Sequence, residues 1–84
     1  MMPYREELQG VFREVFDDDR IVLRPEMTSS DFDGWDSLQH VTLMIAIETR
    51  FNVRFATAEI SKLKNDGSTV GTMLEMLRAK LGDP

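Results

Sequence analysis

Apolar residues recur at intervals of three and four positions in two stretches of the N-terminal half, and this spacing is typical of helices with a buried face. The first predicted helix runs from about Pro3 to Phe16, with the stripe Leu8, Val11, Phe12, Val15 and Phe16. The second covers residues 36–51, and its apolar positions are Leu38, Val41, Leu43, Met44, Ile45, Ile47 and Phe51. These span roughly 220° of a helical wheel, far more than the ~100° stripe of a surface helix. We therefore expect the second helix to touch more than one surface, with a narrow outer face made of Gln39, Thr42, Ala46, Thr49 and Arg50.

Two further helices are expected in the last third of the chain. Thr57 can cap a short third helix, and residues 65–67 (Asn-Asp-Gly) are suited to ending it. Ser68 or Thr69 can cap a fourth helix. The apolar positions are Ile60 and Leu63 in the short helix, and Val70, Met73, Leu74, Leu77 and Leu81 in the last one. Residues 53–55 alternate too briefly to form a strand and are expected to be a loop.

The long segment between the first two helices shows no helical or strand period. It begins with three aspartates at positions 17–19 and continues to Trp35 through many turn-forming residues. Ordered loops of this length are uncommon unless apolar side chains hold them on the protein. The candidates for that role are Ile21, Leu23, Met27, Phe32 and Trp35, with Trp35 as a lid over the core.

These elements predict an all-α fold, a small four-helix bundle with a long loop between helices one and two and a short third helix. The chain has 84 residues, of which 42 % are hydrophobic, and this is enough for one compact core. We therefore expect residues 1–84 to form a single domain. We expect it to be monomeric.

Composition excludes several classes of function. There is no cysteine and only one histidine, so disulfides and clustered His/Cys metal sites are impossible, and we expect no metal. The net charge is −5, and residues 1–36 contain ten acids against four bases, which favours protein partners over nucleic acid. The sequence has neither an apolar leader nor a run long enough to span a membrane, which indicates a cytoplasmic protein.

The most informative residues are at the start of the second helix. Asp36 is suited to the N-cap position, and Gln39 stands three residues later as its capping-box partner. Ser37 would then lie in the first turn with its hydroxyl facing solvent. A phosphate attached there would lie beside free backbone N–H groups and the positive end of the helix dipole. The position therefore suits a phosphodiester.

The Asp-Ser-Leu triplet at positions 36–38 opens the second helix of a short, acidic, four-helix chain, and in this the sequence resembles the acyl carrier protein family. The resemblance covers nearly the whole chain. It implies that Ser37 receives 4′-phosphopantetheine from coenzyme A and that Asp36 is recognised by the phosphopantetheinyl transferase. It also implies a recognition surface for this transferase and for acyl-loading and acyl-processing enzymes, with the apolar contact positions Leu38, Val41 and Ile45. The reactive thiol would belong to the cofactor, so the chain needs no catalytic residue of its own.

The sequence departs from the fatty-acid type of carrier on this second helix. Acidic residues line the helix in that type, whereas here the matching positions are Gln39, Thr42, Thr49 and Arg50, and only Glu48 is acidic. Gln39 and Thr42 are counted with the recognition surface. Because surface charges set encounter rate and partner choice, their loss suggests a dedicated pathway. Residues 64–68 also form a longer link than is usual between the last two helices.

Other functions are open to the sequence. Ser37, His40 and Asp36 could form a Ser-His-Asp hydrolase, but the Gly-x-Ser-x-Gly motif is missing and no oxyanion hole is apparent, so we expect His40 to be an ordinary exposed histidine. A peptidyl or aminoacyl carrier, and an unmodified helical interaction module, remain alternatives. Three methionines could line a cleft for cargo or simply fill the core, and these are Met44, Met73 and Met76.

Overall fold

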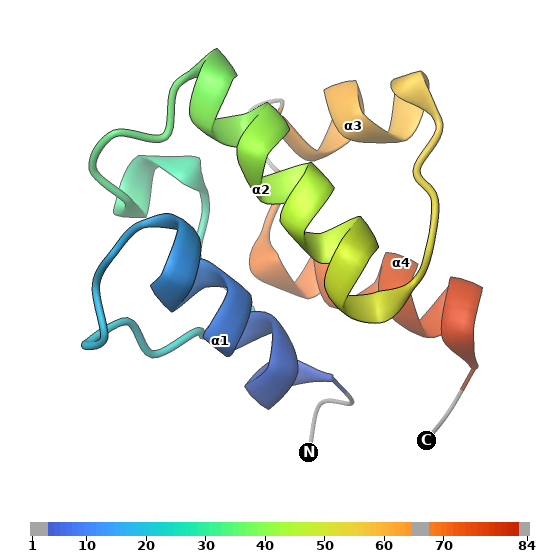
Figure 1. Ribbon diagram of the computed structural model, residues 1–84, viewed down its shortest axis with the longest axis horizontal. Coiled ribbons are helices and arrows are strands. Elements are labelled where there is room, and N and C mark those ends of the chain that lie inside the picture. Colours follow the sequence, from blue (N-terminus) through green and yellow to red (C-terminus); the bar gives the residue numbers. More distant parts are fainter. Residues whose placement is uncertain (1–3, 65–67, 83–84) are drawn as a thin grey trace.

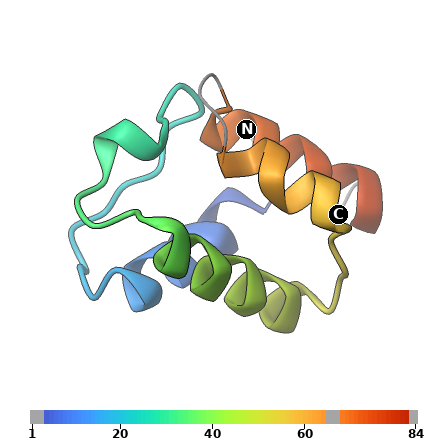
Figure 2. The ribbon, with the colours of Figure 1, turned by 90° about the horizontal axis from the view of Figure 1, so that it is seen from above.

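The computed structural model describes residues 4–64 and 68–82. Its helices are α1 (Arg5–Val15), the 3₁₀ helix η1 (Ser29–Asp31), α2 (Ser37–Phe51), α3 (Thr57–Lys64) and α4 (Val70–Leu81), and the described residues contain no strand. In Figure 1, α2 crosses the middle of the molecule between α1 and α3, and it packs against both. Figure 2 shows α1 and α2 on one side of the molecule and α3 and α4 on the other. The predicted all-α fold, its short third helix and its long first loop are confirmed.

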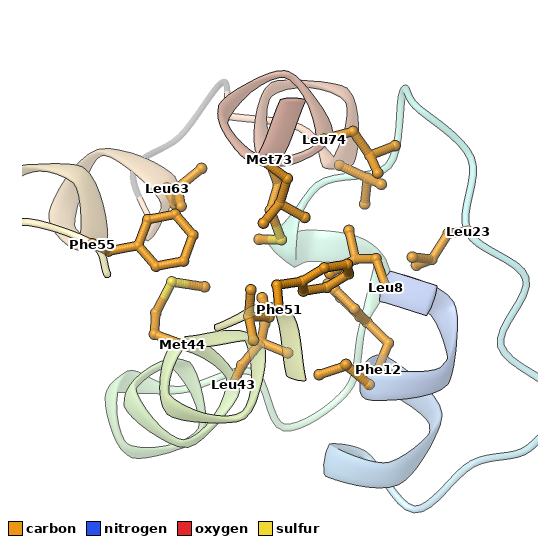
Figure 3. Packing of buried hydrophobic residues seen from close by; sticks show 14 residues of the cluster. Leu8, Phe12, Leu23, Leu43, Met44, Phe51, Phe55, Leu63, Met73 and Leu74 are labelled. Atoms are coloured by element: carbon orange, nitrogen blue, oxygen red, sulfur yellow. The ribbon is translucent and has the colours of Figure 1, made fainter. Parts of the chain in front are cut away.

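The core lies where the inward faces of the four α-helices meet (Figure 3). Met44 and Met73 are almost fully buried, and Figure 3 shows them among Phe55 and Leu63, where they fill the space between α2, α3 and α4. The wholly or nearly buried side chains are Leu8, Val11, Phe12, Leu23, Leu43, Met44, Ile47, Phe51, Phe55, Leu63, Val70, Met73, Leu74 and Leu77. Two of the three methionines therefore serve as core, whereas Met76 is only partly buried.

The first helix is slightly shorter than predicted. It begins at Arg5 after Tyr4, whose φ of 67° is left-handed, and it ends at Val15; Pro3 lies outside the described residues. The end is followed by Asp17, again left-handed with φ 51°. Aspartate tolerates this conformation better than most residues, so the acidic run begins the loop as expected. The hydroxyl of Tyr4 donates to the carbonyl of Gly82 at 2.6 Å, which brings the two ends of the described chain together.

The long loop is packed onto the protein, as the sequence predicts. Leu23 is buried, and the other predicted anchors pack partly buried against the core. Two side chains of α1 bind the backbone of the loop. Gln9 Oε1 accepts from the N–H of Leu23 at 3.0 Å, and Arg13 Nε donates to the carbonyl of Ile21 at 2.8 Å. One turn of 3₁₀ helix, η1, was not predicted and is held by a capping box between Thr28 and Asp31.

The same loop receives the start of α4. Thr69 is the N-cap residue of α4, accepting from the N–H of Thr72 at 3.2 Å. The carbonyl groups of Pro25 and Met27 accept from the N–H groups of Gly71 and Val70 at 2.9 and 2.8 Å. Backbone donors that a helix N-terminus normally leaves free are thus satisfied by the loop.

The third helix begins one residue away from the prediction. Thr57, expected as the cap, is the first helical residue, and Glu59 Oε1 accepts from the N–H of Ala56 before it at 2.8 Å. The predicted end of this helix at residues 65–67, and with it most of the long link to α4, lies outside the described residues. Within the described ranges, no helix has both the length and the apolar character needed to cross a bilayer.

Candidate functional site

Ser37 is the first residue of α2, and its side chain is exposed. The turn before it depends on Gly34, whose φ of 79° is left-handed and suits glycine. The N–H of Asp36 donates to the carbonyl of Gly34 at 3.0 Å, and Asp36 Oδ1 then accepts from the N–H of Gln39 at 2.8 Å. Asp36 is therefore the N-cap, as predicted, and its hydrogen bond holds the first turn of α2, where Ser37 lies.

Two backbone donors remain open beside the hydroxyl. Among the described residues, the N–H groups of Ser37 and Leu38 have no hydrogen-bond partner, and the first turn of α2 contains no acidic side chain. Free N–H groups at a helix N-terminus attract anions, and the helix dipole adds to the attraction. The local structure can therefore accommodate a phosphate on the Ser37 oxygen.

Gln39 does not complete the expected capping box. Its Nε2 donates instead to the carbonyl of Val15 at 2.9 Å, and the Asp36 N–H that it would have bound is already paired with Gly34. This bond ties the start of α2 to the end of α1 and satisfies a carbonyl that α1 leaves free at its C-terminus. The residue is half-buried, and so is Ala46, so the predicted outer face of α2 is narrower than expected.

Trp35 lies two residues before Ser37, at the end of the long loop. As predicted it covers the core, packing edge-on against Phe12 and Phe32 with centroid distances of 5.6 and 5.4 Å, and tilted against Phe16 at 5.7 Å. Its Nε1 donates to His40 Nδ1 at 3.0 Å, and the two rings are stacked. The indole thus connects the loop before Ser37 to the body of α2.

The prediction that His40 is exposed is wrong. Its side chain is 2 % exposed, and its Nε2 lies 2.8 Å from the carbonyl of Ile60 in α3. Because indole N–H can only donate and a carbonyl can only accept, the ring fits both partners when it is neutral with its hydrogen on Nε2. Both nitrogens are thereby engaged away from Ser37, which leaves no base for the hydrolase alternative.

The buried position of His40 could have been found in the sequence. Residues 40, 43, 44, 47 and 51 follow helical spacing, and the structure buries all five of them on one face of α2. The hydrogen bond from Gln39 to Val15 carries no comparable signal, because it depends on how α1 and α2 pack.

The exposed face of α2 is largely apolar. The exposed fractions of Leu38, Val41 and Ile45 are 77, 50 and 57 %, so these three members of the predicted apolar arc face solvent and not a second part of the core. Thr42 lies among them, and its hydroxyl donates to the carbonyl of Leu38 at 3.1 Å. The structure therefore gathers most of the predicted recognition residues, all except Gln39, on one open surface next to Ser37.

Charged side chains are almost missing from this face. Glu48 is half-buried, and its Oε2 accepts from the N–H of Phe55 at 2.8 Å, which holds the turn after α2. Arg50 is exposed, with its guanidinium 5.7 Å from the centre of the Phe51 ring. Within the described residues, no group of three or more histidine, cysteine, aspartate or glutamate side chains is arranged to hold a metal ion.

A comparison with solved structures finds a holo acyl carrier protein from Geobacter metallireducens, whose structure was determined in solution by NMR. It superposes with a TM-score of 0.83 and 40 % sequence identity, over 95 % of this chain and 87 % of that one. The chain belongs to the acyl carrier protein family. It is therefore a carrier of acyl groups and not an enzyme. No protein-family model matches the carrier, and a search of curated protein sequences finds no match either.

Proposed function

We propose that Ser37 bears 4′-phosphopantetheine, whose thiol carries acyl intermediates as thioesters between partner enzymes, and that residues 1–84 form one carrier domain. The observation that supports this most directly is the exposed serine hydroxyl at a capped helix start, beside the free N–H groups of Ser37 and Leu38. The description of the Geobacter protein as a holo carrier agrees with it.

The attachment would need little from the chain itself. Ser37 Oγ would form a bond to phosphorus of coenzyme A, the phosphoanhydride bond would break, and the nucleotide part would leave. The serine proton and the metal ion would be handled by the transferase, since the only histidine of the carrier is buried and engaged. The attached group would supply the sulfur nucleophile that a chain without cysteine lacks.

We infer that the cargo is an acyl group handled by a dedicated pathway, with the transferase and acyl-processing enzymes as partners. Asp36 before Ser37 favours the acyl branch over the aminoacyl one. The scarcity of carboxylates on α2 argues against the partners of the general fatty-acid synthase. A cytoplasmic location and a monomeric state stay predictions. Fragmentation of the loaded arm by mass spectrometry tests the cargo, and an amino acid on the thiol would contradict this inference.

The modification is tested by incubating the purified chain with coenzyme A and a promiscuous phosphopantetheinyl transferase, followed by intact-mass measurement. We expect wild type to gain the mass of one phosphopantetheine and Ser37→Ala to gain none. Ser61→Ala is the matched control, because Ser61 is also an exposed serine on a helix, and it should be modified like wild type. An unmodified wild type would favour the interaction-module alternative, and modification of Ser37→Ala would place the cofactor elsewhere.

A further inference from the structure

The packing of α2 against α3 indicates whether a cargo attached through Ser37 can be buried inside the protein. We propose that the α2–α3 interface is closed to the acyl chain, that His40 is the residue that closes it nearest to Ser37, and that the cargo is therefore a short or polar acyl group that stays outside the helices. The inference rests on the proposed modification of Ser37 and adds the class of the cargo.

Three residues of α2 lie in line with Ser37 on the side that packs against α3 and the turn before it. Residues 37, 40, 44 and 48 are spaced at i, i+3, i+7 and i+11, which places them along one side of the helix. His40 lies one turn from Ser37, about 4.5 Å along the helix axis. A chain that folds back from Ser37 along this side therefore meets His40 first, then Met44 and Glu48.

Each of these three residues is engaged. The buried His40 has its Nε2 2.8 Å from the carbonyl of Ile60 in α3. Met44 is also buried and belongs to the core cluster. Glu48 Oε2 accepts from the N–H of Phe55 at 2.8 Å. At successive turns of α2, the interface is thus closed by a hydrogen bond, by packed apolar atoms and by a second hydrogen bond.

The opposite side of α2 is closed by α1 and the long loop. Gln39 Nε2 donates to the carbonyl of Val15 at the end of α1. The ring of Trp35 packs against Phe12 and Phe16. An acyl chain that starts at Ser37 therefore meets packed side chains on both sides of the helix.

A buried chain would also need space inside the core. Protein interiors are close-packed, and a cavity of about 150 Å³ holds a molecule only as large as benzene. The region between α2, α3 and α4 is occupied by buried side chains (Figure 3), which are Met44, Phe55, Leu63 and Met73. An acyl chain could enter this region only by displacing them.

The remaining methionine that the sequence offered for a cargo cleft lies elsewhere. Met76 borders a hollow of about 790 Å³ whose lining residues come from the long loop, α3 and α4. Its lining includes the charged residues Glu26, Lys62 and Glu75. This hollow neither begins at Ser37 nor offers an apolar enclosure for a hydrocarbon chain.

A closed interface favours one class of cargo. A hydrocarbon chain that remains in water is disfavoured in proportion to its length, because each CH₂ group adds apolar surface. Short acyl groups, and acyl groups that carry hydroxyl, keto or carboxyl groups, have less apolar surface to bury. The structure therefore suits the transport of short or polar acyl groups.

The experiment loads the carrier with acetyl or octanoyl groups, by transfer from acetyl- or octanoyl-coenzyme A with a promiscuous phosphopantetheinyl transferase, and intact mass confirms the loading. We expect the two loaded forms of wild type to have urea midpoints within about 0.2 M of each other. The methyl NMR signals of Met44 and Met73 should coincide in the two forms, because only a buried chain would displace these side chains. A higher midpoint or shifted signals in the octanoyl form would overturn the inference.

The role of His40 is tested by variants loaded in the same way. His40→Ala removes the bond to Ile60 and leaves a space next to Ser37, so its octanoyl form should unfold at a urea midpoint about 0.5 M higher than its acetyl form. His40→Gln keeps an N–H donor for the Ile60 carbonyl and should show no such difference. Leu8→Ala opens a space in α1 instead, and it should be destabilised equally in both forms.

The possible failures are distinguishable. Equal midpoints for the two forms of His40→Ala, or the same difference in Leu8→Ala, would show that His40 does not close the interface. The wild-type comparison needs no variant, so it tests the closed interface even if a variant does not fold. A long hydrocarbon chain on the arm recovered from native cells would contradict the cargo class. If wild type accepts no group from coenzyme A or its thioesters, the proposed function itself fails.

Discussion

The single histidine joins three parts of the structure. His40 belongs to α2, accepts a hydrogen bond from Trp35 in the long loop, and lies 2.8 Å from the carbonyl of Ile60 in α3. A buried polar group is stable only when it is paired, and here both ring nitrogens have partners. Because Trp35 precedes Ser37 by two residues, this contact also fixes the loop from which the serine is presented.

Replacing His40 by alanine should therefore destabilise the whole fold. The variant leaves the Trp35 N–H without its acceptor and opens a cavity, and together these effects should lower the free energy of unfolding by about 2 to 4 kcal/mol. Urea unfolding followed by the fluorescence of Trp35, the only tryptophan, measures the change. Thr49→Ala, at an exposed position of the same helix, should change stability by less than about 0.5 kcal/mol. Equal stability of the two variants would contradict this role of His40.

At the residue scale, the sequence predicts those features that depend on a few neighbouring residues. The cap at Asp36 and the exposure of Ser37 depend on one turn of backbone and follow from residue type and position. The burial of His40 follows from its place on the apolar face of α2 and not from its residue type, because histidine is only intermediate in its tendency to be buried. The bond from Gln39 to Val15 spans 24 positions, and no local pattern could show it.

At the scale of elements, one acidic side chain connects the start of α3 with the end of α4. Glu59 Oε1 accepts from the N–H of Ala56 at 2.8 Å and from Lys80 Nζ at 3.0 Å. The bond from the Ala56 N–H and, after it, the bond from Lys80 hold the pKa of Glu59 below its ordinary value. Asp18 is similar, because hydrogen bonds from the backbone and side chain of Arg20 lower its pKa.

A lowered pKa in the folded state means that the folded state favours the ionised carboxylate. The contribution of Glu59 to stability is therefore fully present above the ordinary glutamate pKa of about 4.3 and is lost as the pH falls through the lower folded value. Glu59→Gln should be less stable than wild type at pH 6 to 7, and the difference should shrink below about pH 4. Unfolding by urea at a series of pH values measures it. Glu75→Gln, exposed on α4, is the control, and a pH-independent difference for Glu59→Gln would exclude the carboxylate as its cause.

Apolar spacing predicts the α-helices, and the observed bounds differ from the predicted ones by one or two residues. α2 matches its predicted span, and α1 begins later than predicted because Tyr4 takes a left-handed conformation. The hydrogen bonds from the start of α4 to the carbonyl groups of Pro25 and Met27 could not be predicted from the sequence, because every residue type has the same backbone carbonyl. The apolar positions of α2 could not be divided from the sequence into buried and exposed ones, and Leu38, Val41 and Ile45 are exposed.

At the scale of the whole molecule, the long loop is as much a part of the core as a helix would be. Leu23 is 1 % exposed, its N–H is bound by Gln9, and its carbonyl accepts from Arg5 at 3.2 Å. The neighbouring loop carbonyls of Pro25 and Met27 receive the N-terminus of α4. Through these hydrogen bonds the loop holds α1 and α4 together.

If the loop is part of the cooperative core, shortening its buried apolar side chain should destabilise the whole fold and not the loop alone. Leu23→Ala removes a side chain that is enclosed on all sides, so it should lower the free energy of unfolding by about 2 to 5 kcal/mol. Val22→Ala, one residue earlier and 53 % exposed, should cost less than about 1 kcal/mol, because most of the lost side chain already faces water.

Hydrogen exchange supplies the second measurement. In wild type the Leu23 amide should exchange as slowly as core amides of α2, and in Leu23→Ala both should exchange faster together. A Leu23→Ala variant that loosens only the loop, with α2 protection unchanged, would show that the loop folds separately from the helices it connects.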